Sequence, residues 1–87
     1  MSTIAAIATQ PGGALGIVRV SGELSVKIVD RFFRGRVKLT DCEPNKIVFG
    51  EFLDKDGSIL GYVGVIVYHA PNSYTGEDMV EIISHSQ

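Results

Sequence analysis

A short polar segment between two β-rich arms constrains the fold more than any other feature of the sequence. Residues 46–53 and 58–70 are both rich in Ile, Val, Phe and Tyr, and residues 54–57 (DKDG) separate them. An Asp-Gly pair between two such runs is typical of a β-hairpin, because glycine adopts the positive φ angles that these turns need. Within the second arm, the apolar run of residues 62–68 (YVGVIVY) predicts a central strand covered on both faces.

The rest of the chain predicts one helix and further strands. Residues 23–33 carry Leu, Ile, Val and Phe at intervals that fall on one helical face, which predicts a helix of about three turns with Gly35 as its C-terminal cap. Residues 37–44 have no clear period and are expected to form a loop. Apolar and β-branched residues predict three more strands, at residues 3–9, 14–21 and 79–85. The sequence therefore predicts the α+β class, with a small, mixed, mainly antiparallel sheet and a flanking helix.

Length and charge exclude several classes of protein. A chain of 87 residues has room for one small domain. Eight basic against ten acidic side chains give a net charge of -2, which disfavours a stand-alone nucleic-acid binder. The single Cys42 cannot form an internal disulfide, and no apolar stretch approaches the roughly 18 residues of a membrane span. A cytoplasmic protein with no membrane partner is expected.

Residues 79–85 resemble a strand that continues beyond the given sequence, so a piece cut from a longer protein is also expected.

Three common kinds of active site find little support in the motifs. Residues 12–16 (GGALG) follow a predicted strand but do not match a dinucleotide-binding fingerprint, and no Gly-Lys-Ser/Thr of a P-loop occurs. His69 and His85, with Asp78 or Glu81, have no zinc-site spacing. A Ser-His-Asp hydrolase lacks its nucleophile-elbow motif. We therefore expect no metal site and no catalytic residue in this chain.

Arg19 and Glu81 are more informative, because each charge interrupts an apolar strand. Arg19 lies in residues 16–22 (GIVRVSG), and Glu81 lies in residues 79–83 (MVEII). Strand alternation allows both side chains to be simply solvated. If both border one cleft, however, a guanidinium and a carboxylate are groups that pair with planar polar heterocycles through two parallel hydrogen bonds.

Three blocks of sequence resemble one known family. They are residues 3–9 (TIAAIAT), 16–22 (GIVRVSG) and above all 70–82 (APNSYTGEDMVEI). They look like the N-terminal domain of the MnmE (TrmE) family of tRNA-modification GTPases, in that family's order. The resemblance implies that residues 1–87 are a truncated N-terminal domain, similar to the folate-binding domain of glycine-cleavage aminomethyltransferases. It also implies that this N-terminal domain binds a 5-formyltetrahydrofolate-type cofactor and forms a homodimer.

The resemblance also implies a role for the whole protein. With a flavoprotein partner, MnmG (GidA), the family modifies the wobble uridine of certain tRNAs. Its GTPase activity belongs to a G domain that binds GTP, Mg and K; neither that domain nor the family's helical domain is expected in these residues. Two alternatives stay open, a folate-dependent aminomethyltransferase-like fragment and a purely structural dimerisation domain.

By motif, Arg19 and Glu81 fall on the family's folate contacts. A pterin presents a ring N–H and an amino group as adjacent donors, and the Glu81 carboxylate has the acceptors for both. Arg19 is expected to serve an acceptor of the ligand or to orient Glu81. Residues 10–14 (QPGGA) and 83–87 (ISHSQ) depart from the family's pattern, so the loop shape and the role of His85 are not predicted. The sequence likewise leaves open whether this chain binds folate or dimerises by itself, the one-carbon state of the ligand and the tRNA specificity.

Overall fold

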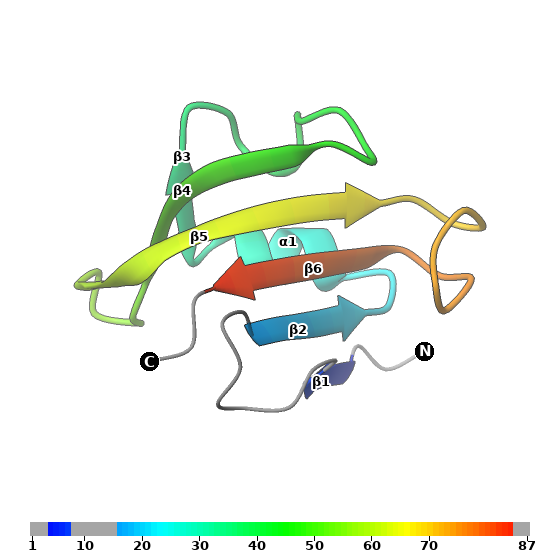
Figure 1. The fold of residues 1–87 in the computed structure, drawn as a ribbon, viewed down its shortest axis with the longest axis horizontal. Coiled ribbons are helices and arrows are strands. Elements are labelled where there is room, and N and C mark those ends of the chain that lie inside the picture. Colours follow the sequence, from blue (N-terminus) through cyan, green and yellow to red (C-terminus); the bar gives the residue numbers. More distant parts are fainter. Residues whose placement is uncertain (1–3, 8–15, 85–87) are drawn as a thin grey trace.

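The computed structural model describes residues 4–7 and 16–84, which form one antiparallel sheet with a short helix on one face (Figure 1). The sheet has the strand order β1-β2-β6-β5-β4-β3, and each neighbouring pair is antiparallel. The predicted α+β class with a flanking helix is thus confirmed. The elements are β1 (Ile4–Ile7), β2 (Gly16–Ser21), α1 (Ser25–Asp30), β3 (Phe33–Gly35), β4 (Ile47–Leu53), β5 (Ile59–Tyr68) and β6 (Met79–Ser84).

The predicted hairpin joins β4 to β5. The amide of Gly57 donates to the carbonyl of Asp54 at 2.9 Å, and the amide of Asp54 donates to the carbonyl of Ser58 at 2.8 Å. Gly57 has a φ of 90°, so it takes the left-handed conformation that side chains with a Cβ rarely adopt. The Asp-Gly pair therefore forms the turn, with the glycine alone at positive φ.

The core lies between the sheet and α1, on what we call the helix face. Val63, Val65 and Val67 of β5 alternate toward this face, and each is buried. Val20 and Val80 contribute from β2 and β6, and Val29 contributes from α1. Because side chains alternate along a strand, the residues between these valines point to the opposite, open face.

The prediction that β5 is covered on both faces is wrong for the described residues. Tyr62 is 71% exposed, and Ile66 and Tyr68 are only partly buried. No helix of the described chain lies on the open face (Figure 1). The run of residues 62–68 is apolar on both sides nevertheless, so its open side presents apolar surface to solvent.

The predicted helix is real but shorter than expected. It spans Ser25–Asp30, and the chain then turns so that Phe33 opens β3. Phe33 fits the helical spacing of the sequence, yet its ring is buried in the core beside the sheet. Leu24 and Ile28, which share that spacing, are 49% and 38% exposed. The loop predicted over residues 37–44 is confirmed, and Leu39 within it is a core residue, 1% exposed.

Gly35 is not the cap of that helix, as was predicted, but a residue of β3. It pairs with Gly50 of β4, and the ring of Phe33 packs on both glycines. A Cβ atom at Gly35 would lie 2.7 Å from the Phe33 ring, and one at Gly50 would lie 2.7 Å from it. Both positions therefore need glycine for close packing.

The last described strand, β6, lies in the middle of the sheet between β2 and β5 (Figure 1). Residues 69–78 connect β5 to β6 and contain a cis peptide bond between Ala70 and Pro71. No helix of the described residues has the length and apolar character needed to cross a membrane.

Candidate functional site

Arg19 and Glu81 meet on the open face. They are direct partners in the register of β2 and β6, and Arg19 Nε donates to Glu81 Oε2 at 2.7 Å. Their side chains are 30% and 13% exposed, so the ion pair is partly shielded from water but reachable from it. The two residues thus lie side by side on neighbouring strands, but neither of the hollows described below is lined by them, so the shared cleft considered from the sequence is not found among those hollows. Their charged groups touch, so any ligand would meet the pair from outside rather than lie between its members.

Tyr68 completes the environment of Glu81. It lies on β5, the other neighbour of β6, and its hydroxyl donates to Glu81 Oε1 at 2.9 Å. Burial raises the pKa of Tyr68, and the hydrogen bond to Glu81 raises that pKa further, because a phenolate beside a carboxylate is unfavourable. The phenol therefore stays a donor at neutral pH, and each carboxylate oxygen of Glu81 has one fixed partner.

Tyr74 reaches the same site from the loop of residues 69–78. Its ring lies over the Arg19 guanidinium, with Arg19 Cζ 4.4 Å from the ring centroid, which is cation-π geometry. The ring is otherwise open, since Tyr74 is 79% exposed. An exposed aromatic ring beside a charged pair provides a surface on which a planar ligand can stack.

Several hydrogen bonds hold this loop over the end of the sheet. The hydroxyls of Ser21 and Thr75 are 2.7 Å apart, and Ser21 is buried. The amide of Gly22 donates to the carbonyl of Asp78 at 2.8 Å, and the amide of Ala70 donates to Asp78 Oδ1 at 2.9 Å. The motif of residues 70–82 thus supplies both Glu81 and the loop that presents Tyr74.

The group of Arg19, Glu81, Tyr68 and Tyr74 has unused hydrogen-bonding capacity. A carboxylate has about four acceptor positions, of which Arg19 and Tyr68 each occupy one, so each oxygen of Glu81 keeps one. A guanidinium has about five N–H donors, and only Nε of Arg19 is used toward Glu81. The arrangement can accept two adjacent donors, donate to a nearby acceptor and stack against a ring.

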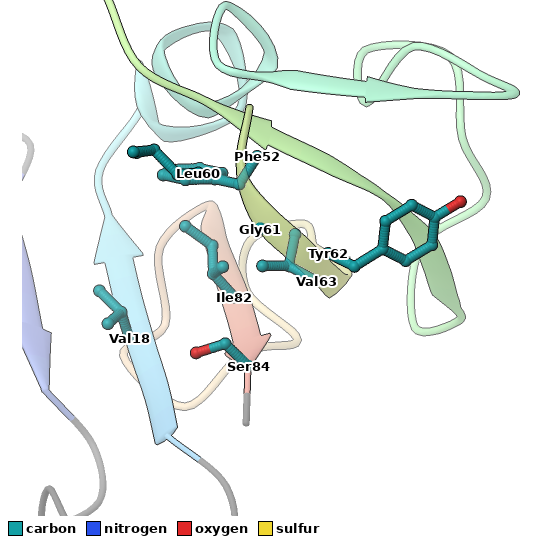
Figure 2. Close-up of a pocket in the computed structure, with 8 residues that line it drawn as sticks. All are labelled: Val18, Phe52, Leu60, Gly61, Tyr62, Val63, Ile82 and Ser84. Atoms are coloured by element: carbon teal, nitrogen blue, oxygen red, sulfur yellow. The ribbon is translucent and has the colours of Figure 1, made fainter. Parts of the chain in front are cut away.

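A hollow of about 510 Å³ lies on the helix face and is a different site from the Arg19–Glu81 pair (Figure 2). Val18 and Ile82 point into it, and these residues alternate with Arg19 and Glu81 along β2 and β6. Phe52 and Leu60 make its wall mainly apolar. A smaller hollow of about 350 Å³ lies on the open face, where Gly64 leaves space between Ile47, Phe49 and Ile83. Neither hollow is lined by Arg19 or Glu81.

The other groups singled out in the sequence do not assemble in the described chain. His69 Nδ1 lies 3.9 Å from Asp78 Oδ1, and no group of three possible metal ligands occurs among the described residues. His85 and residues 12–15 of the glycine-rich loop lie outside those residues. Cys42 is partly buried, and burial raises the pKa of its thiol. Its Sγ donates to the carbonyl of Leu39 at 3.3 Å.

Sequence reasoning did not assign Tyr68 or Tyr74 to the site. In the sequence Tyr68 belongs to an apolar run, and its contact with Glu81 depends on the register of β5 and β6. Strand alternation gave a signal for it, since Tyr68 is in phase with the non-core positions of β5. For Tyr74, the only feature of the sequence that could have assigned it to the site is its position within the motif of residues 70–82.

The sequence of the chain matches one family of known proteins. The family model described as "GTP-binding protein TrmE N-terminus" matches residues 3–87. A tRNA modification GTPase MnmE of Thermotoga maritima is 45% identical over 86 residues, which cover 98% of this chain and 18% of the relative. Those of Listeria innocua and Acholeplasma laidlawii are 43% and 44% identical over 84 residues, covering 95% of the chain and 18% of each relative. The chain thus spans less than a fifth of the length of these relatives.

Proposed function

Since this chain belongs to the family of TrmE N-terminal domains, we propose that it binds a tetrahydrofolate of the 5-formyl type at Arg19 and Glu81. The observation that carries the proposal is the paired guanidinium and carboxylate on the open face, with a free acceptor on each oxygen of Glu81. The domain is a binding module in this proposal, and it supplies no catalytic residue of its own.

The residues present fit the chemistry of a pterin. The ring N–H and the amino group of a pterin are neighbouring donors, and the two oxygens of Glu81 match them as a bidentate acceptor. Arg19 keeps donors for an acceptor atom of the same ring, and it holds Glu81 in place. The exposed ring of Tyr74 offers a stacking surface beside the pair. When bound, the folate would supply one-carbon chemistry, which these residues position.

The test is an isothermal calorimetric titration with 5-formyltetrahydrofolate, which measures the binding affinity. Glu81→Ala removes both acceptors, and losing hydrogen bonds to a charged group costs about 1.5 to 3 kcal/mol, which corresponds to roughly 10-fold to 150-fold weaker binding. Glu81→Gln retains the shape but replaces one acceptor by a donor, so we expect binding to weaken there as well. Thermal unfolding of each variant verifies that it is folded.

Glu51→Ala is the matched control. Glu51 also lies on the open face, and it also pairs with an arginine across two strands, Arg34, at 3.0 Å. The same charge is removed and a similar pair is broken. This variant is expected to keep the parent affinity within about twofold, because Glu51 and Arg34 lie on β4 and β3, separated by β5 from the strand that carries Glu81. Equal affinities for the parent protein and a folded Glu81→Ala variant would rule out the assigned role.

The names of the relatives support a proposal for the whole protein. They are named as tRNA modification GTPases, and we propose that the longer protein modifies the wobble uridine of tRNA with a flavoprotein partner of the MnmG type, in the cytoplasm. GTP, Mg and K belong to a separate G domain in this proposal. Activity of the complete protein on undermodified tRNA, with and without the folate, tests this role.

Self-association is a second function that a specific observation favours. Phe49, Tyr62 and Ile47 are 62%, 71% and 44% exposed, and they surround the hollow at Gly64 on the open face. Contiguous apolar surface of this kind is typical of protein interfaces. We propose that a second copy of the chain covers it in a homodimer.

A further inference from the structure

The basic side chains are strongly segregated along the chain. Five of the eight Lys and Arg residues fall within residues 27–38, where Asp30 is the single acidic residue. This segment therefore carries a formal charge of +4, that is five minus one, and the other residues carry -6, that is three minus nine. The net charge of -2 hides this separation, because it averages a basic segment with an acidic remainder.

The structure leaves four of these cations exposed, on α1, at its C-terminal end and after β3. Lys27 and Arg31 are exposed and four residues apart on and just after α1, a spacing that places side chains on the same helical face. Arg36 and Lys38 are exposed in the segment that follows β3. We name Lys27, Arg31, Arg36 and Lys38 the basic patch.

One hydrogen bond brings the segment that contains Lys38 to the C-terminal end of α1. The amide of Leu39 donates to Asp30 Oδ1 at 2.7 Å, which fixes the segment next to Lys38 against the end of α1. Leu39 and Val29 belong to the same buried cluster, so packing reinforces that contact. Asp30, the one acidic residue of the segment, therefore holds the loop in place through this hydrogen bond.

None of the four cations takes part in an ion pair among the described residues. Within the described part of the chain, ion pairs involve Arg19, Arg34, Lys46 and His69, and none involves a member of the basic patch. Arg34 is excluded from the patch because Glu51 neutralises it across β3 and β4. Exposed and unpaired cations spread over a surface suit a polyanion better than one small anion.

We propose that the basic patch is a contact surface for the phosphate backbone of RNA. The inference rests on the proposed function, since a tRNA-modifying protein has a polyanionic RNA as its substrate. The patch has no aromatic side chain among its members, so it is expected to position RNA through phosphates and not to read its bases. It lies on elements that do not contribute Arg19, Glu81, Tyr68 or Tyr74, so folate and RNA binding are separable.

The experiment measures the affinity for fluorescently labelled tRNA by anisotropy at several salt concentrations. Four phosphate contacts predict that the affinity falls about 50-fold to 150-fold between 50 and 200 mM salt, because each contact contributes about 0.7 to 0.9 to the log-log slope. Lys27→Gln with Arg31→Gln, and separately Arg36→Gln with Lys38→Gln, should each lower the slope by about 1.4 to 1.8. Arg31→Lys in place of Arg31→Gln should restore half of the loss in the first pair.

The control is Lys46→Gln with Lys55→Gln, which removes the same charge from exposed positions outside the patch. Its slope should stay within about 0.5 of the parent value. The inference is overturned if this control and the patch variants weaken tRNA binding equally, if the parent protein does not bind tRNA at 50 mM salt, or if the patch binds phosphatidylserine vesicles in preference to tRNA.

The affinity of the same variants for 5-formyltetrahydrofolate separates this inference from the proposed function. Patch variants that lose tRNA affinity but keep folate affinity support the assignment of the patch. A parent protein that binds tRNA through the patch and does not bind the folate contradicts the folate proposal alone.

Discussion

At the scale of single residues, the site depends on a carboxylate whose two oxygens are fixed by different strands. Arg19 holds one oxygen of Glu81 from β2, and Tyr68 holds the other from β5. A partly buried carboxylate with two donors loses little further freedom when a ligand binds, which favours affinity. Tyr68 is therefore a positioning residue, because it acts on a ligand only through Glu81.

Tyr68→Phe tests this contact through protein stability. A hydrogen bond to a charged acceptor contributes about 1.5 kcal/mol or more, so the variant should be less stable by roughly that amount at pH 7. The pKa of Tyr68 is raised in the folded protein, so an unfolded chain loses the phenolic proton first as the pH rises. The stabilising effect is thus complete below about pH 10, the ordinary tyrosine value, and is lost as the pH rises through the higher folded pKa.

Chemical denaturation of both proteins between pH 7 and pH 11 measures the difference. Tyr62→Phe is the control, since Tyr62 is 71% exposed and no hydrogen bond of its hydroxyl occurs among the described residues. Its stability difference from the parent protein should be near zero across this range. A Tyr68→Phe difference that does not shrink above pH 10 would contradict the contact with Glu81.

At the scale of elements, close packing between strands determines that Phe33 belongs to a strand, which the apolar spacing of the sequence does not show. The helical period of residues 23–33 was a sound signal for a helix, but Phe33 satisfies a sheet position equally well. The two glycines that receive its ring, Gly35 and Gly50, come from different strands. Such a pocket for a side chain exists only after β3 and β4 have paired, so a local pattern cannot reveal it.

Gly50→Ala measures how much that packing contributes. The added Cβ would lie 2.6 Å from the carbonyl oxygen of Arg34 and 2.7 Å from the Phe33 ring, so the backbone of the edge strand has to move. Overpacking of this kind typically costs about 1 to 3 kcal/mol of unfolding free energy. Urea denaturation gives the value.

Gly61→Ala is its counterpart in β5, where nothing lies within 4 Å of the added Cβ. We expect a change of less than about 0.5 kcal/mol there, since alanine also restricts the unfolded chain. If both substitutions have equal effects, the close approach around Phe33 is not what requires glycine at position 50.

At the scale of the whole molecule, the two faces of the sheet differ, because α1 packs on the helix face and no helix of the described residues covers the open face. The hairpin, the loop at residues 37–44 and the strands other than β3 were predictable, because each depends on local sequence. The uncovered open face was not predictable, since an apolar run such as residues 62–68 looks the same whether a helix or another molecule covers it. The meeting of Arg19 with Glu81 was expected from family motifs, whereas the tyrosines around them required the register.

Phe49→Asp tests whether a second copy covers the open face. A buried aromatic residue at an interface typically contributes about 2 kcal/mol or more, so the dimer should dissociate roughly 30-fold more readily. Sedimentation equilibrium measures the dissociation constants. Leu24→Asp is the control, because Leu24 is also an exposed apolar residue, 49% exposed, and lies beside α1 instead. An equal weakening by both substitutions, or no self-association of the parent protein, would exclude this interface.

The position of β6 in the middle of the sheet also has a consequence during synthesis. Arg19 and Glu81 are 62 residues apart in sequence, and β6 is the last described strand to leave the ribosome. The β4–β5 hairpin has local partners in the nascent chain, whereas β2 and β5 cannot complete their inner edges until residues 79–84 emerge. A polypeptide interrupted before that point would leave two apolar strand edges exposed to aggregation and would lack half of the charged pair.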